Sequence, residues 1–144
     1  MKETSLHADL KQWYALPGDL FEARVDRFVV DIIRGDLLIE IQTSNFSAIK
    51  HKLVHLLEHH PVRLVYPLPQ EKWIIRQSAI DGSRLSRRRS PKRGRIEHLF
   101  DELVRLPELA LSSNFSFEIL FTREEEIRRN DGLGSWRWIV ARAA

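Results

Sequence analysis

Two carboxylates and one amide interrupt an otherwise apolar stretch, VDIIRGDLLIEIQT, which covers residues 30–43. These three side chains are Asp31, Glu40 and Gln42. If Gly35-Asp36 forms a two-residue hairpin turn, Asp31 falls directly opposite Glu40, with Cβ atoms about 4.5–5.5 Å apart. The two-residue period of a strand puts Gln42 on the same face as Glu40. The spacing therefore predicts that three polar side chains converge at one point of a hairpin.

The expected pair of like charges needs a positive partner. Two carboxylates directly opposite each other destabilise a hairpin unless a cation lies between them. A divalent cation such as Mg²⁺ or Mn²⁺ suits carboxylate oxygens, and it can activate water and bind a phosphate. A solvated hairpin face is the alternative interpretation. It fits less well because the surrounding residues are apolar on both faces of the strands, which is typical of strands covered on both sides: Ile32, Leu38, Ile39 and Ile41.

The elements around this hairpin follow from apolar periodicity and from turn residues. Helical spacing is expected in residues 5–16, 44–60 and 96–106, and extended structure in the remaining apolar runs. Pro17, Gly18 and Pro61 mark boundaries between elements. The expected strands cover residues 21–33 (bent near Asp26), 37–43, 62–68 and 72–80, with a C-terminal hairpin of residues 116–129 and 135–143.

In this order of elements, Asp31 followed by Glu40-Ile41-Gln42 resembles the PD-(D/E)XK (restriction-endonuclease-like) nuclease superfamily. The resemblance covers roughly residues 6–68, and its motif is short. It implies an α/β fold with a restriction-endonuclease-like core, in which a mixed central sheet is flanked by helices. It also implies a nuclease in which Asp31 and Glu40 bind Mg²⁺ or Mn²⁺, with Glu22 as the acidic residue that joins the metal site from upstream.

The sequence departs from the superfamily pattern at Gln42, which stands where the motif usually has Lys. An amide can position a water molecule but supplies no positive charge, so the motif reads E-x-Q. In some members the Lys has moved to the following helix, where this chain has Lys50 and Lys52. We expect Lys52 to take the catalytic role, and we keep Asp26 as the competing metal ligand because a bulge in the strand would bring it to the same face.

Basic residues gather in one segment of the chain. The net charge is only +3, yet seven basic residues and no acidic ones lie between residues 84 and 95. Such a cluster attracts phosphate, so we expect a basic loop over residues 81–95 that binds nucleic acid, DNA rather than RNA. The basic residues are Arg84, Arg87, Arg88, Arg89, Lys92, Arg93 and Arg95.

The basic loop suggests a division of the chain. Residues 1–80 would form the nuclease-like core, and residues 96–144 would form a small C-terminal α+β extension of one helix plus a β-hairpin. That extension could resemble a winged helix, with Arg128, Arg129 and Arg137 near its tip, or it could pack as part of one domain.

Composition excludes several classes of function. The chain has no cysteine, no P-loop and no dinucleotide fingerprint. His51 and His55 are four residues apart but fall opposite the apolar stripe of their helix, which favours a solvated face over a zinc site. No apolar run is long enough to span a membrane or serve as a signal, so we expect a cytoplasmic protein without a membrane partner.

Three functional hypotheses remain open on this sequence. The first is a metal-dependent phosphodiesterase acting on nucleic acid. A homodimer is compatible with this hypothesis. The second is a non-catalytic nucleic-acid- or protein-binding module on a degenerate nuclease core. The third is an assembly domain whose hairpin edge, with Trp136 and Trp138, forms an interface.

Overall fold

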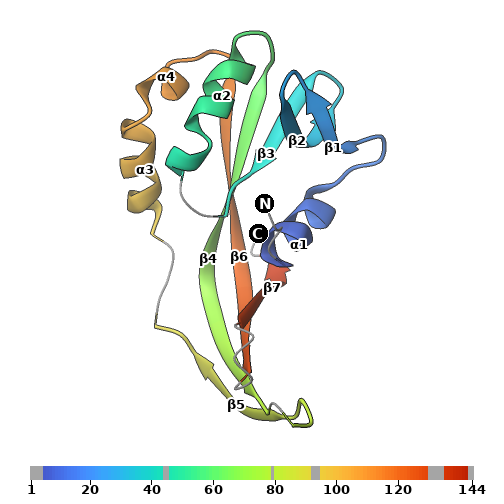
Figure 1. The fold of residues 1–144 in the computed structure, drawn as a ribbon. Helices are drawn as coiled ribbons and strands as arrows, with labels where there is room; N and C mark the ends of the chain where they lie inside the picture. The colour runs from blue at the N-terminus through green and yellow to red at the C-terminus, as the bar shows by residue number, and fades with distance from the viewer. Residues whose placement is uncertain (1–4, 44–45, 79, 92–94, 130–134, 143–144) are drawn as a thin grey trace.

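A computed structural model of the chain describes residues 5–43, 46–78, 80–91, 95–129 and 135–142. Its centre is a mixed seven-stranded sheet in the order β1-β2-β3-β4-β6-β7, with β5 paired to one end of β4. Helix α1 lies on one side of the sheet, and α2, α3 and α4 lie on the other (Figure 1). The expected α/β class, with a mixed sheet flanked by helices, is therefore confirmed. Among the described residues, no helix is both long and apolar enough to cross a membrane.

The first three strands form an antiparallel meander. They are β1 (Leu20–Val25), β2 (Phe28–Arg34) and β3 (Leu37–Ile41). The predicted two-residue turn is confirmed, since Ile32 pairs with Ile39 and Gly35 has a φ of +62°. The single bent strand expected over residues 21–33 is wrong, because a tight turn at Asp26, with φ +54°, splits it into β1 and β2.

Strand β4 (Val62–Gln77) is continuous, where the sequence predicted two strands separated at Pro69. The direction of its backbone groups explains the difference. The N–H of Val62 donates toward β6, to the carbonyl of Asn114, while the carbonyl of Val65 accepts from Gln42 beside β3. Odd-numbered residues therefore face the β3 side, where β3 ends beside Val65. Pro67 and Pro69 stand at odd positions past that end, so their missing N–H groups break no ladder bond.

The basic segment is not the loop that was expected over residues 81–95. Residues Arg84–Arg89 form strand β5, which pairs antiparallel with the end of β4. Pairing with β4 is a tertiary interaction, and the run RLSRRR has no apolar alternation that would have revealed it.

The C-terminal residues do not form a separate winged-helix-like extension. Strand β6 (Phe115–Arg129) runs parallel to β4 along its length and so belongs to the central sheet. The expected hairpin with β7 (Ser135–Arg142) is confirmed, and its NDGLG turn lies outside the described residues. Helix α3 (Ile96–Val104) was predicted, whereas the short helix α4 (Pro107–Ala110) was not.

Apolar side chains cover both faces of the sheet. On one face, Leu6 and Leu10 of α1 (Ser5–Tyr14) pack with Ile32, Ile39 and Ile41. On the other face, buried leucines of α2 (Lys50–Leu57) join those of α3 and α4, and the 3₁₀ turn Phe46–Ala48 adds a buried ring. The polar side chains of the central hairpin therefore lie between two covered layers.

Candidate functional site

Strands β2 and β3 separate at Asp31 and Glu40. Their backbone ladder ends at the pair Ile32–Ile39, and side chains take over beyond it. The backbone N–H of Ile41 donates to Oδ2 of Asp31 over 2.8 Å, and the N–H of Asp31 donates to Oε1 of Glu40 over 3.2 Å. The two carboxylates therefore satisfy backbone donors that the separation leaves without ladder partners.

The alternation of β2 also changes at Asp31. Val30 packs in the core under α2, yet Ile32, two residues later, packs in the core under α1. A regular strand would put both side chains on one face. This local break lets the Asp31 carboxylate turn toward the opening between the strands.

Each helical layer brings one basic side chain to a carboxylate. From α2, the Nζ atom of Lys52 lies 2.8 Å from Oε1 of Glu40 and also donates to the carbonyl of Val29. From α1, Nε2 of His7 lies 3.3 Å from Oδ2 of Asp31 and 3.1 Å from the carbonyl oxygen of Ile41. Because a carbonyl oxygen only accepts, the Nε2 atom of His7 carries a proton in this arrangement.

The two carboxyl groups have opposite electrostatic environments. Burial, together with the negative charge of Asp31, raises the pKa of Glu40 to about 7, although Lys52 opposes this shift. Burial alone would raise the pKa of Asp31, but hydrogen bonds from His7 and from the Ile41 N–H hold it below its usual value. At neutral pH, Asp31 is therefore ionised, whereas Glu40 is partly protonated.

Asp31 and Glu40 are the two carboxylates that could contact a small divalent cation here. Among the described residues, no group of three or more His, Cys, Asp and Glu side chains is arranged to hold a metal ion. Mg²⁺ nevertheless commonly takes only one or two carboxylates and completes its coordination with water and substrate phosphate. A cation between Asp31 and Glu40 would oppose both the burial and the Asp31 charge that raise the pKa of Glu40.

The other predicted site residues are placed differently. Glu22 is exposed, and its Oε1 lies 2.7 Å from Nζ of Lys11 on α1. The φ of Glu22 is +49°, which interrupts the alternation of β1 at the position beside Asp31. Gln42 directly follows β3, is half-buried, and donates its backbone N–H to Val65. Asp26, the competing ligand, is exposed in a turn and contacts His55 at 3.2 Å.

The basic residues of α2 have different partners, and only one of them reaches the carboxylate pair. Lys52 reaches Glu40, whereas Lys50 lies 3.5 Å from Glu108. The predicted solvated histidines contact surface groups, since Arg27 donates to His51 and His55 meets Asp26. Among the residues described, none of these contacts joins either histidine to the carboxylate pair.

His7 was not predicted as a site residue. A signal was present in the spacing of α1, where His7 and Lys11 are four residues apart and share one helix face. Each meets an acidic residue of the adjoining meander, Asp31 for His7 and Glu22 for Lys11. The sequence alone does not say which acidic residues lie under that face.

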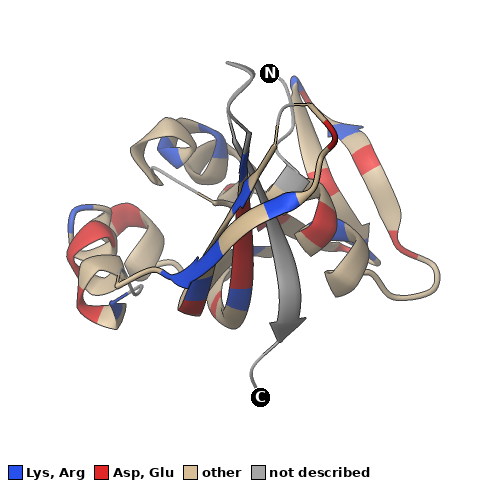
Figure 2. Ribbon diagram, turned by 90° about the horizontal axis from the view of Figure 1, so that it is seen from below, with Lys and Arg blue, Asp and Glu red and all other residues tan. Residues whose placement is uncertain are grey.

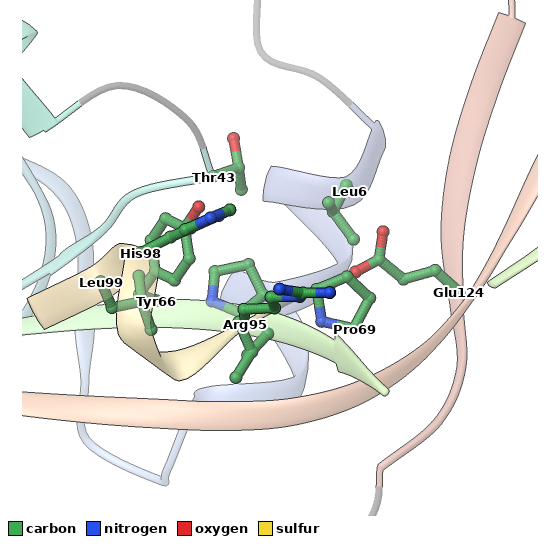
Figure 3. Close-up of a pocket in the computed structure, with 10 residues that line it drawn as sticks. Leu6, Thr43, Tyr66, Pro69, Arg95, His98, Leu99 and Glu124 are labelled. Carbon is green, nitrogen blue, oxygen red and sulfur yellow. The ribbon is translucent and has the colours of Figure 1, made fainter. Parts of the chain in front are cut away.

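A cavity of about 200 Å³ lies along residues 66–69 of β4, and neither Asp31 nor Glu40 is among the described residues that line it. Arg95 and His98 at the start of α3 line it together with Leu6 of α1 (Figure 3). The side chains of Arg95 and Glu124 extend toward one another across it (Figure 3). This cavity was not predicted, because its walls come from four separate elements.

The seven basic residues of the predicted loop separate in the structure. Four lie on β5 and are exposed, Lys92 and Arg93 lie outside the described residues, and Arg95 lines the cavity. Near the C terminus, Arg128 pairs with Glu126 at 3.2 Å. The other C-terminal side chains that were predicted to form a contact surface lie outside the described part of the chain: Arg129, Trp136, Arg137 and Trp138.

Comparisons with known proteins give a family for the chain. A family model described as a domain of unknown function, DUF8091, matches residues 4–143. An uncharacterized protein of Treponema pallidum (strain Nichols) is 32% identical over 138 residues, which cover 95% of this chain and 55% of that relative. The chain thus spans about half the length of this curated relative. No solved structure matches the chain. By the extent of the family match, the chain belongs to the DUF8091 family.

Proposed function

We propose that the chain is a metal-dependent nuclease on a restriction-endonuclease-like core, with its site at Asp31, Glu40 and Lys52. The observation that carries this proposal is the convergence of the three side chains at the opening between β2 and β3. Two carboxylates lie across that opening, and an ammonium group from α2 lies 2.8 Å from one of them. A carboxylate pair can hold a metal ion, and an adjacent ammonium group can stabilise the negative charge that develops on a phosphate.

The residues divide the work by their chemistry. Asp31 and Glu40 would hold Mg²⁺ or Mn²⁺, which when bound lowers the pKa of water and offsets charge on a phosphate. Lys52 supplies the positive charge that Gln42 lacks, and Gln42 orients water by its amide. His7 keeps Asp31 ionised and in place by its hydrogen bond.

The exposed arginines of β5 would bind the substrate backbone. Phosphate contacts from Arg and Lys supply most sequence-independent affinity for nucleic acid. The proposed substrate is DNA rather than RNA. Formation of a homodimer stays a prediction.

A non-catalytic binding module is the second candidate, and one observation favours it. The Oε1 atom of Glu40 already accepts from the Asp31 N–H and from Lys52. The carboxylates therefore have a structural role that is complete without a metal ion.

A cleavage assay with labelled DNA and Mn²⁺ separates the two candidates. Lys52→Met should lower the rate about 100-fold or more, since one preorganised charge contributes about that much. Lys50→Met is the matched control, because Lys50 is on the same helix but pairs with Glu108, and its rate should equal that of the wild type. No cleavage by the wild type, or equal rates for both variants, would contradict the nuclease proposal.

A further inference from the structure

The distal half of the sheet carries a stacked pair of flat side chains. The guanidinium carbon of Arg87 on β5 lies 4.0 Å from the ring centroid of Trp73 on β4. Acidic neighbours hold both groups, since Trp73 Nε1 donates to Glu71 over 2.6 Å and Arg87 lies 3.6 Å from Glu125. Arg123 in turn lies 3.3 Å from Glu71. The ring and the guanidinium are therefore oriented before any ligand arrives.

Further exposed arginines lie on β5 near this pair, and one of them, Arg89, also interacts electrostatically with Glu71. Arg89 pairs directly with Trp73 in the ladder, and Arg84 pairs with Gln77. Within the described chain, Arg84, Arg88 and Arg89 form no ion pair, and all three are exposed. Figure 2 shows the basic residues in blue along β5. Arg89 is two residues from Arg87 and so lies on the same face of β5 as the stacked pair, whereas Arg88 lies on the opposite face. Exposed guanidinium groups along one strand attract a polyanion.

The outer edge of β5 also presents backbone donors. The N–H of Ser90 donates to the carbonyl of Lys72, so the alternate residues Arg87 and Arg89 direct their N–H groups away from β4. A second copy of β5 at this edge would place arginines opposite arginines, which destabilises strand pairing. An anionic chain satisfies both the donors and the charges.

We infer that this edge binds single-stranded nucleic acid, with a base stacked on the Arg87–Trp73 pair and phosphates on the neighbouring arginines. The inference rests on the proposed function, because it names the substrate class of that nuclease. Bases of single strands stack on aromatic rings and on guanidinium planes. Bases inside a duplex have no free face, so a duplex would gain only the phosphate contacts.

Fluorescence anisotropy without divalent cations tests the inference. The probes are an oligothymidylate, an abasic strand of the same length and charge, and a duplex. The wild type should bind the oligothymidylate about tenfold more tightly than the abasic strand, since stacking on one base contributes about that factor. Arg87→Lys keeps the charge and loses the guanidinium plane, so it should lose most of the preference for the oligothymidylate over the abasic strand.

Arg128→Lys is the matched control, because Arg128 lies outside β5 and is paired with Glu126, and this variant should retain the preference for the oligothymidylate. Trp73→Phe keeps a ring and should retain part of that preference. Thermal unfolding checks that each variant is folded. Equal wild-type affinity for the oligothymidylate and the abasic strand, tighter binding to the duplex, or tighter binding to polyglutamate would overturn the inference. Because no metal is present, failure of cleavage leaves this result unaffected, and failure here leaves the carboxylate site untouched.

Discussion

At the scale of single residues, Glu40 combines a structural bond with an unfavourable charge. Its carboxylate accepts from the Asp31 N–H and from Lys52, yet burial and Asp31 raise its pKa to about 7. Removing the whole side chain would lose both effects at once. Gln separates them, because its amide oxygen can still accept the two bonds while the negative charge is gone.

Glu40→Gln should change how stability depends on pH. The pKa of Glu40 lies above its ordinary value of 4.5, so between these values the folded state binds more protons than the unfolded state. Wild-type stability therefore falls as pH rises from about 4.5 to about 7, and the Gln variant lacks this loss. Relative to the wild type, the variant should gain roughly 2–3 kcal/mol between pH 4.5 and pH 8. Urea unfolding of both proteins at pH 4.5 and pH 8 measures the difference in their free energies of unfolding. If this difference is the same at the two pH values, folding does not raise the pKa of Glu40.

The pair of carboxylates was predictable because a two-residue turn fixes which residues lie opposite each other. Their role was harder to predict from the sequence. The sequence suggested repulsion that a cation between them relieves, and a divalent metal suits that place, whereas the structure shows both carboxylates bound to backbone N–H groups of the separated strands. Helical periodicity could place Lys52 in reach of the sheet, but the approach of His7 depends on how α1 packs on the meander.

At the scale of elements, local signals were reliable and relations between strands were not. Helices α1 and α3 and both hairpins follow from periodicity and turn residues that lie close together in sequence. Continuity of β4 through Pro67 and Pro69 depends on which neighbour each N–H faces, and β5 forms only because the end of β4 is available to pair with it. Neither relation can be read from a segment alone.

Strand β5 supports a prediction about nucleic-acid binding. Changing Arg88 and Arg89 to Gln should weaken binding and flatten its dependence on salt. Each lost phosphate contact should reduce the slope of log K against log salt by about 0.7–0.9. Titrations over a range of potassium chloride concentrations measure the slope. Arg128→Gln is the control, because Arg128 is paired with Glu126; equal slopes for all three proteins would exclude β5 from the contact.

At the scale of the whole molecule, β4 connects the two proposed surfaces. Glu40 pairs with Leu64 near the start of β4, and β5 pairs with the other end beyond Trp73. At about 3.3 Å per residue, roughly 30 Å separate these positions along the strand. A strand of nucleic acid bound at β5 must be extended over that distance to reach the carboxylates. The predicted boundary between residues 1–80 and 96–144 would separate these surfaces, whereas one sheet joins them in the structure.

The most direct test of the central claim is a calorimetric titration of the wild type with Mn²⁺ at pH 8. The account predicts saturable binding of about one ion per chain, lost in Glu40→Gln and retained in Glu22→Gln, because the Glu22 carboxylate is paired with Lys11. Metal binding to deprotonated ligands is favoured at this pH. No saturable binding at millimolar Mn²⁺, or equal binding by Glu40→Gln and the wild type, would contradict a metal site at Asp31 and Glu40.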